Sequence, residues 1–215
     1  AYVYKSLRST PELSFGVREM GCMAGVVVTA SHNPVEYNGY KAYWEDGAQV
    51  VEPHASGIVN EVNKINGFDE IKLMSEEEAK EKGLIIVLDE KIDDLYIEAI
   101  KTQVINKEIK GKEKFKIVYT PLHGTGMMSI PRSLKLWGFD NVHCVKEQMV
   151  KDGNFPTVVS PNPENGEALT LALRDAKELD ADIVMASDPD ADRIGIDLTS
   201  YPSARNFTFG VIANF

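Results

Sequence analysis

The feature that most constrains the fold is the alternation of strand-like and helix-like stretches in the second half of the chain. Strands are expected over 115–119, 142–145 and 182–186, with helices over 127–137 and 167–179 between them. Strands that alternate with helices of this length form a mostly parallel sheet with helices on both faces. Ligands bind such sheets at the carboxyl ends of the strands, so the loops that follow strands are the places to look for function.

The first half of the chain predicts a second α/β unit. Thr10 is expected to cap a helix that has Pro11 at its first position and runs to about Met20. A strand over 25–29 and a hairpin over 40–51 follow.

Further helices are expected from Pro53 to about Ile65, over 75–82 and over 92–105, and a lysine-rich link covers 107–114. The predicted fold class is therefore α/β, with two three-layer α/β domains and mixed, mostly parallel sheets. We expect the domains to cover 1–88 and 89–200, and we assign no domain to residues 201–215.

Charge and composition narrow the class of partner and the compartment. The 215-residue chain carries a net charge of −10, which predicts no nucleic-acid partner and no binding to an anionic membrane surface. No apolar run approaches the roughly 20 residues of a transmembrane helix. Only Cys22 and Cys144 are present, so neither a disulfide framework nor a cysteine zinc site is expected, and a cytoplasmic setting is predicted.

Three aspartates, Asp188, Asp190 and Asp192, follow the third expected strand of the second half. At alternate positions of an extended turn their carboxylates can point to one side, and together they would repel strongly unless a cation lay between them. A calcium loop of the helix-loop-helix type needs Gly at the sixth position and Glu at the twelfth, where this chain has Arg193 and Thr199. Mg²⁺ is therefore the preferred ion, with Arg193 placed to reach a phosphate.

A serine follows the strand of the first half, in the stretch Thr29-Ala-Ser-His-Asn-Pro34. Ser31 and Asn33 have the composition of a simple turn, and adjacent Ser31 and His32 are expected to point apart rather than to form a serine–base pair. If the hairpin folds back, Lys41 lies near the Ser31 hydroxyl. A hydroxyl near a cation and a metal suits phosphoryl transfer, in which catalysis is mainly positioning and charge neutralisation.

Taken together, TASHNP, DPDADR, NGYKAYWEDGAQV, TPLHGTG and DGNFPTVVSPNPE resemble the α-D-phosphohexomutase family, in particular its branch of phosphoglucomutases and phosphopentomutases of the eukaryotic second type. The resemblance covers about residues 6–198. It implies a Mg²⁺-dependent isomerase of carbohydrate metabolism, a phosphoprotein that moves a phosphoryl group between C1 and C6 of a hexose, or C1 and C5 of a pentose, through a bisphosphate intermediate.

The same resemblance assigns roles to individual residues. It implies that Ser31 is phosphorylated, that Ser31, Asp188, Asp190 and Asp192 hold the metal, and that Lys41 carries protons. It makes His32 a residue of the phosphoserine loop, and it places Arg193 and Asn33 at the substrate. A complete member has four domains, so the chain is expected to be a portion of a longer enzyme; the sugar-selecting and phosphate-gripping loops of the third and fourth domains are absent here.

Two alternatives remain open at this point. In a magnesium-dependent phosphatase, Asp188 would be the nucleophile, Asp190 the acid–base group, and Ser31 only structural. In a sugar-phosphate-binding module descended from a mutase, no residue would be catalytic. The presence of Ser31 together with the three aspartates weighs against this alternative, because a pure binder would not need a nucleophile.

Overall fold

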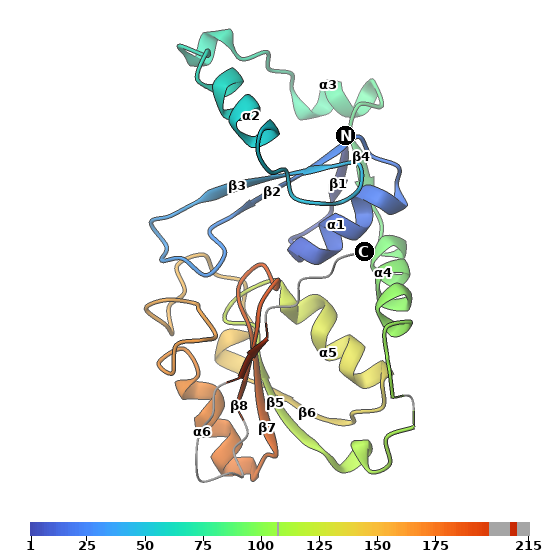
Figure 1. The fold of residues 1–215 in the computed structure, drawn as a ribbon, viewed down its shortest axis with the longest axis vertical. Helices are drawn as coiled ribbons and strands as arrows, with labels where there is room; N and C mark the ends of the chain where they lie inside the picture. Colours follow the sequence, from blue (N-terminus) through green and yellow to red (C-terminus); the bar gives the residue numbers. More distant parts are fainter. Residues whose placement is uncertain (107, 198–206, 210–215) are drawn as a thin grey trace.

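A computed structural model describes residues 1–106, 108–197 and 207–209, and Figure 1 shows their arrangement. The helices and strands of the first half are β1 (Tyr2–Tyr4), α1 (Thr10–Glu19), β2 (Ala24–Thr29), β3 (Gly39–Trp44), α2 (His54–Val62), α3 (Glu76–Glu81) and β4 (Ile86–Leu88). Those of the second half are α4 (Lys91–Lys101), β5 (Lys116–Thr120), α5 (Gly126–Leu136), β6 (Asn141–Cys144), α6 (Thr170–Leu179), β7 (Ile183–Ser187), β8 (Ile194–Asp197) and β9 (Phe207–Phe209).

The second half is built on a five-stranded mixed sheet with the order β6-β5-β7-β8-β9. β5 pairs in parallel with β6 and β7, whereas β8 runs antiparallel to β7. Helix α6 packs against β5 and β7, α5 packs against β6, and Figure 1 shows the two helices on opposite sides of these strands. The core between the sheet and α6 contains Val118, Val145, Ala172, Ala176, Ala181 and Val184, all buried.

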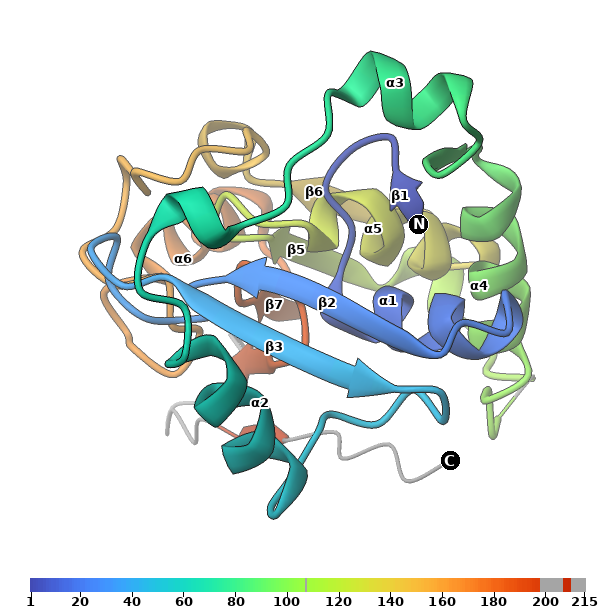
Figure 2. The same ribbon diagram turned by 90° about the horizontal axis from the view of Figure 1, so that it is seen from above.

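The first half contains two small sheets. β1 and β4 pair in parallel, and β2 and β3 form an antiparallel hairpin in which Thr29 lies opposite Gly39 and Val27 opposite Lys41. Figure 2 shows β2 and β3 as a long ribbon with α1 against it, and α1 contacts both strands. The chain is thus α/β with mixed sheets, as predicted.

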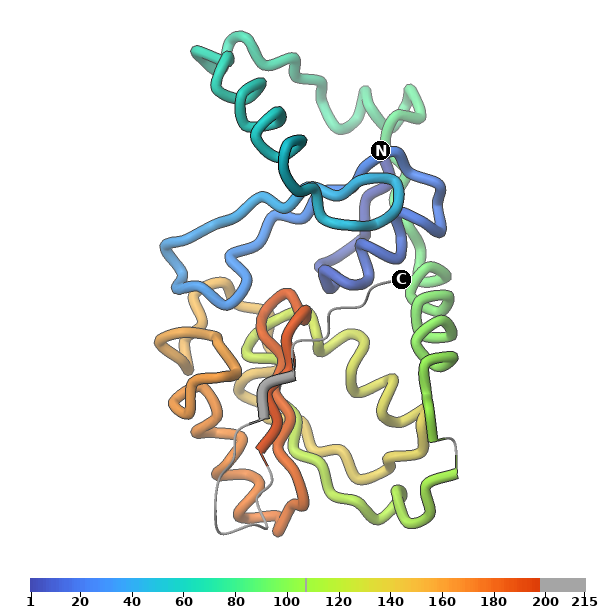
Figure 3. Tube along the Cα trace, viewed as in Figure 1, coloured from blue at the N-terminus to red at the C-terminus, as the bar shows by residue number. Residues whose placement is uncertain are grey.

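Helix α4 joins the two halves, because it contacts α1 on one side and α5 on the other. A second junction lies near the functional loops, where Thr10 N–H donates to the carbonyl of Asp190 at 2.8 Å. A third is the hydrogen bond from Ser160 Oγ to the carbonyl of His32 at 3.2 Å. In Figure 3 the loop after β2 accordingly lies beside the orange loop that precedes α6. None of the helices described is both long and apolar enough to cross a membrane.

Two predicted details were wrong. The cap of α1 is Ser9, whose hydroxyl accepts from Glu12 N–H at 3.3 Å, rather than Thr10. The expected return strand of the 40–51 hairpin is reduced to a bridge between Tyr43 and Gln49, because the main partner of β3 is β2. The sequence reading also missed β4 and β8, which are only three and four residues long. The unassigned segment 201–215 lies outside the described residues, apart from the backbone of β9.

Candidate active site

Ser31 lies directly beyond the end of β2, in a turn that the local sequence stabilises. The hydroxyl of Thr29 accepts from Ser31 N–H at 2.8 Å, and Asn33 N–H donates to the carbonyl of Ala30 at 3.0 Å. The φ angle of Ser31 is 53°, a left-handed conformation that is uncommon for a residue with a side chain. Such a conformation at a loop serine is typical of functional sites, where the surrounding structure holds a side chain in one direction.

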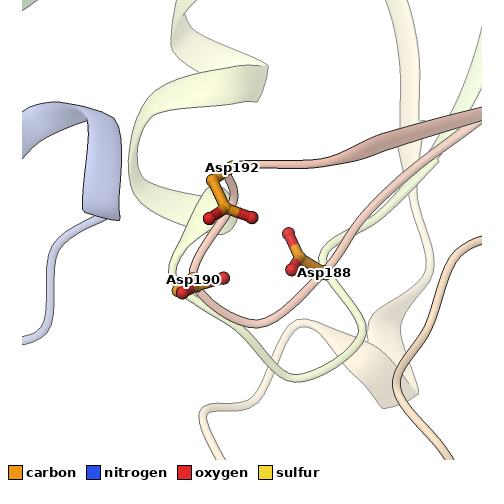
Figure 4. Close-up of side chains that lie close together, drawn as sticks. All are labelled: Asp188, Asp190 and Asp192. Atoms are coloured by element: carbon orange, nitrogen blue, oxygen red, sulfur yellow. The ribbon is translucent and has the colours of Figure 1, made fainter. Parts of the chain in front are cut away.

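The three aspartates follow β7 and form one cluster, as Figure 4 shows. One oxygen from each of Asp188, Asp190 and Asp192 lies within 4.8 Å of the others, and Asp188 and Asp190 are buried. The turn is tight because Ala191 N–H donates to the carbonyl of Asp188 at 3.0 Å, with a φ of 55° at Ala191. Arg193 N–H donates to Asp188 Oδ1 at 3.0 Å.

The glycine turn after β5 positions this acidic turn. Thr125 donates to the carbonyl of Pro189 twice, from its N–H at 2.8 Å and from its hydroxyl at 3.0 Å. A side chain at Gly124 would overlap the backbone of Pro189. Glycine is therefore required at position 124 for the two loops to approach closely.

The fold brings Ser31 and Lys41 to aspartates that lie 149 to 159 positions further along the chain. Ser31 Oγ lies 3.4 Å from both Asp188 Oδ2 and Asp190 Oδ1. Lys41 Nζ donates to Asp190 Oδ2 at 2.8 Å and to Asp192 Oδ2 at 3.0 Å. The register of the hairpin contributes to this position, because Lys41 lies opposite Val27, close to the carboxyl end of β2.

The electrostatics of the cluster favour a cation. Burial, followed by the negative charges of Asp190 and Asp192, raises the pKa of Asp188 to about 8. Burial would also raise the pKa of Asp190, but the hydrogen bond from Lys41 outweighs it and lowers that pKa below its usual range. Burial alone would lower the pKa of Lys41, yet its bonds to Asp190 and Asp192 raise it. One ammonium thus stabilises two of the three carboxylates.

The donor set fits an oxygen-liganded metal ion. Three carboxylates cluster at the site. One of their oxygens, Asp192 Oδ1, is buried and has no hydrogen-bond partner within the part of the chain that the structure describes. An orphaned buried carboxylate oxygen costs free energy unless an ion or solvent satisfies it. Hard oxygen ligands of this kind select Mg²⁺, Ca²⁺ or Mn²⁺ over softer metals.

His32 contradicts one expectation. Adjacent side chains were expected to diverge, but Ser31 Oγ and His32 Nδ1 are 3.3 Å apart, because the left-handed backbone at Ser31 turns the chain. Burial and the nearby charge of Arg193 lower the pKa of His32, so the ring favours its neutral form.

Neither Arg193 nor Asn33, the two residues expected at the substrate, is among the described residues that line the cavity beside Ser31. The guanidinium of Arg193 lies 3.5 Å from the carboxylate of Glu164. Asn33 closes the turn through its backbone.

Thr10 was not expected at the site, yet its hydroxyl donates to Asp190 Oδ2 at 3.1 Å. Its assignment as a helix cap concealed this contact; because Ser9 caps the helix, the Thr10 side chain is free to reach the aspartate.

A cavity of about 400 Å³ opens beside Ser31. Its walls include Ser31, Asp190 and the glycine turn, and Arg8 and Lys151 add cationic side chains. Asp188 is fully buried and is not among the residues that line the cavity. Of the two candidate nucleophiles, only Ser31 lines the cavity.

Comparison with known families places this geometry in a wider context. Residues 94–198 match the family description "Phosphoglucomutase/phosphomannomutase, alpha/beta/alpha domain II", and residues 1–67 match domain I of the same family. The first match includes the aspartate turn, and the second includes Ser31 and Lys41.

Relatives agree with these matches. The chain is 41% identical to a phosphoglucomutase of Staphylococcus haemolyticus over 90% of its own length and 35% of that protein. It is 37% identical to a glucose 1,6-bisphosphate synthase of Homo sapiens over 90% of its length and 31% of that protein. The chain therefore spans about a third of the curated relatives that it matches.

A solved structure of a phosphoglucomutase/phosphomannomutase family protein from Burkholderia thailandensis shares the fold, with a TM-score of 0.66 and 24% identity. The alignment covers 92% of this chain and 40% of that one.

Proposed function

The chain belongs to the phosphoglucomutase/phosphomannomutase family, and from this premise we propose that the full-length protein is a phosphosugar mutase with Ser31 as its phosphoryl carrier. The substrate would be a hexose or pentose monophosphate, and the reaction would move its phosphate between C1 and C6, or between C1 and C5, through a bisphosphate. The observation that carries the proposal is the position of Ser31, which lines a cavity and has its hydroxyl 3.4 Å from two clustered carboxylates.

In the first half-reaction, an oxygen of the sugar phosphate attacks the phosphorus of phospho-Ser31. The bond between phosphorus and Ser31 Oγ breaks and a new phosphorus–oxygen bond forms to the sugar. Ser31 Oγ receives a proton from a carrier, and the proton of the sugar hydroxyl restores that carrier, so one proton passes net from the sugar to Ser31. The second half-reaction reverses these steps at the other phosphate of the bisphosphate.

We propose that Asp188, Asp190 and Asp192 hold Mg²⁺ with an oxygen of Ser31. The ion, when bound, would supply positive charge beside the phosphoryl group as it is transferred. The burial of Asp188 and Asp190 supports this role, because charges act more strongly away from water.

We assign the proton transfer to Lys41. Its ammonium reaches Asp190 Oδ2 at 2.8 Å, and Asp190 Oδ1 lies 3.4 Å from Ser31 Oγ, so Lys41 is one carboxylate away from the leaving oxygen. The raised pKa of Lys41 keeps it protonated and suits donation to Ser31 as the phosphoryl group departs. Neutral His32 is the competitor, and it is closer to Ser31 than its adjacency predicted.

The test is a turnover assay of the full-length protein on glucose 1-phosphate and ribose 1-phosphate, with product positions read by ³¹P NMR. Ser31→Ala should abolish conversion, whereas Ser56→Ala, at an exposed hydroxyl of α2, should leave it unchanged. Lys41→Ala should lower turnover about 10²–10⁴-fold, and His32→Ala should cost less. A slower His32 variant would reassign the proton carrier.

The aspartate-nucleophile phosphatase is not favoured, because Asp188 is fully buried and accepts from the backbone of Arg193. Net release of inorganic phosphate by the Ser31→Ala variant would nevertheless establish it. The two free cysteines, Cys22 and Cys144, support a reducing, cytoplasmic setting for the proposed enzyme.

A further inference from the structure

A buried polar network fixes one loop of the cavity without touching Ser31. Gln148 is fully buried; its Oε1 accepts from Thr120 Oγ1 at 2.6 Å and its Nε2 donates to Thr157 Oγ1 at 3.0 Å. The ring of His123 lies 2.9 Å from the carbonyl of Val150 through Nδ1 and 2.8 Å from Thr157 Oγ1 through Nε2. Because satisfied buried polar groups favour one defined conformation, the segment 150–157 is anchored at both of its ends.

This loop places Lys151 in the wall of the cavity that Ser31 also lines. The Lys151 side chain is half-buried, and no hydrogen bond or ion pair is found for its ammonium within residues 1–106, 108–197 and 207–209. Burial and then the positive charge of Arg8 lower its pKa. Arg8, by contrast, is already paired, since Asp93 accepts from its Nε at 2.8 Å and from its Nη2 at 2.7 Å.

The cavity of about 400 Å³ that Lys151 lines leaves room for an anion; its wall also carries Asp152, which makes no ion pair with Lys151 within the described residues. A half-buried ammonium without a counter-charge is unfavourable, and a phosphate group in the cavity would supply that charge and accept its hydrogen bonds. Lys41 has no such capacity, because two carboxylates already occupy its ammonium.

We propose that Lys151 is a phosphate-binding residue, which holds the phosphate group of the substrate at the Ser31 end of the cavity. The identity of that substrate as a sugar phosphate depends on the proposed function, whereas the binding of a phosphate group by Lys151 does not. The network of His123, Gln148 and Thr157 acts as its support, by fixing the loop that carries it.

Direct binding of inorganic phosphate tests this role. The probe is titrated into the full-length protein in EDTA, by calorimetry, after intact mass has shown that no phosphate is attached. Lys151→Ala should weaken binding by about tenfold or more, which is the loss typical of one charge-assisted hydrogen bond. Lys151→Arg should retain most of the affinity. Lys177→Ala, at an exposed position of α6, should bind as the native protein does.

Equal affinities of the native protein and Lys151→Ala would overturn the proposal, and so would the lack of any saturable phosphate binding to the native protein. The assay does not depend on catalysis. If the protein shows no mutase turnover but its phosphate binding requires Lys151, the proposed function is refuted and the Lys151 site stands. If the protein is an active mutase whose phosphate binding does not depend on Lys151, the site is refuted and the proposed function stands.

Discussion

Lys41 and a bound metal ion compete for the same carboxylates, and this competition gives a prediction that separates binding from catalysis. Lys41 Nζ donates to Asp190 at 2.8 Å and to Asp192 at 3.0 Å, with only 20% of the lysine side chain and 3% of the Asp190 side chain exposed. In the metal-free protein, Lys41→Met leaves two carboxylates without that ammonium. Loss of one partner of a largely buried pair costs about 3–5 kcal/mol, which partial solvent access at Lys41 reduces to about 2–4 kcal/mol.

Once Mg²⁺ is bound, the ion neutralises the same oxygens, so the cost of removing Lys41 should shrink. Thermodynamic linkage then requires that Mg²⁺ binds more tightly to Lys41→Met than to the native protein. A difference of about 2 kcal/mol corresponds to about a 30-fold change in affinity. The unusual expectation is a variant that binds metal better and catalyses worse.

The assay is isothermal calorimetry of Mg²⁺ binding, together with thermal unfolding in EDTA and in saturating Mg²⁺. Lys101→Met is the matched control, because Lys101 forms an exposed pair with Glu98 at 3.3 Å and should change neither quantity measurably. Equal or weaker Mg²⁺ binding by Lys41→Met, with the protein folded, would refute the reasoning.

Three further perturbations follow from the structure. Gly124→Ala should lower the free energy of unfolding by about 1–3 kcal/mol and weaken metal binding, because its Cβ overlaps Pro189 in the aspartate turn. Gly166→Ala, with open space around it, should do neither. Equal calorimetric titrations of metal into the two variants would contradict this.

Burial and Asp93 raise the pKa of Glu12 to about 8, so its contribution to stability is complete below about pH 4.5 and is lost as the pH rises through 8. The free energy of unfolding of the native protein should therefore fall, relative to that of Glu12→Gln, by up to about 1.4 kcal/mol per pH unit between about pH 5 and 8. Parallel stability–pH profiles of the two proteins would exclude the effect. Thr10→Val removes the hydroxyl that donates to Asp190 and should lower turnover severalfold. Ser9→Ala removes the helix cap and should mainly lower stability. Steady-state kinetics and thermal melts of both variants would test this difference.

The sequence predicted the parallel core of the second half because its strands and helices have a strong period. β5, α5, β6, α6 and β7 all lie within a few residues of their expected positions. The short strands β4 and β8 escaped notice, since three or four residues cannot show a period, and their pairing is decided by distant partners.

The sequence named residues that the fold brings together, but it did not predict their contacts. The spacing of the aspartates predicted their clustering, whereas Lys41 was expected near the Ser31 hydroxyl and instead donates to Asp190 and Asp192. The 3.3 Å approach of His32 to Ser31 depends on one left-handed residue, which no spacing reveals. The Thr10 contact joins residues 180 positions apart, and the lack of a Lys151 partner among the described residues depends on loops from several segments. Such properties arise from tertiary structure rather than from local pattern.

The identity of the phosphorylated residue tests the central claim most directly. The active full-length protein should be isolated after turnover with glucose 1-phosphate and glucose 1,6-bisphosphate, and then digested for peptide mapping by mass spectrometry. We predict one phosphate, stable to acid, on Ser31. Phosphate found on Asp188 and lost in mild alkali, or no phosphate on Ser31 in a protein that turns over, would contradict the account.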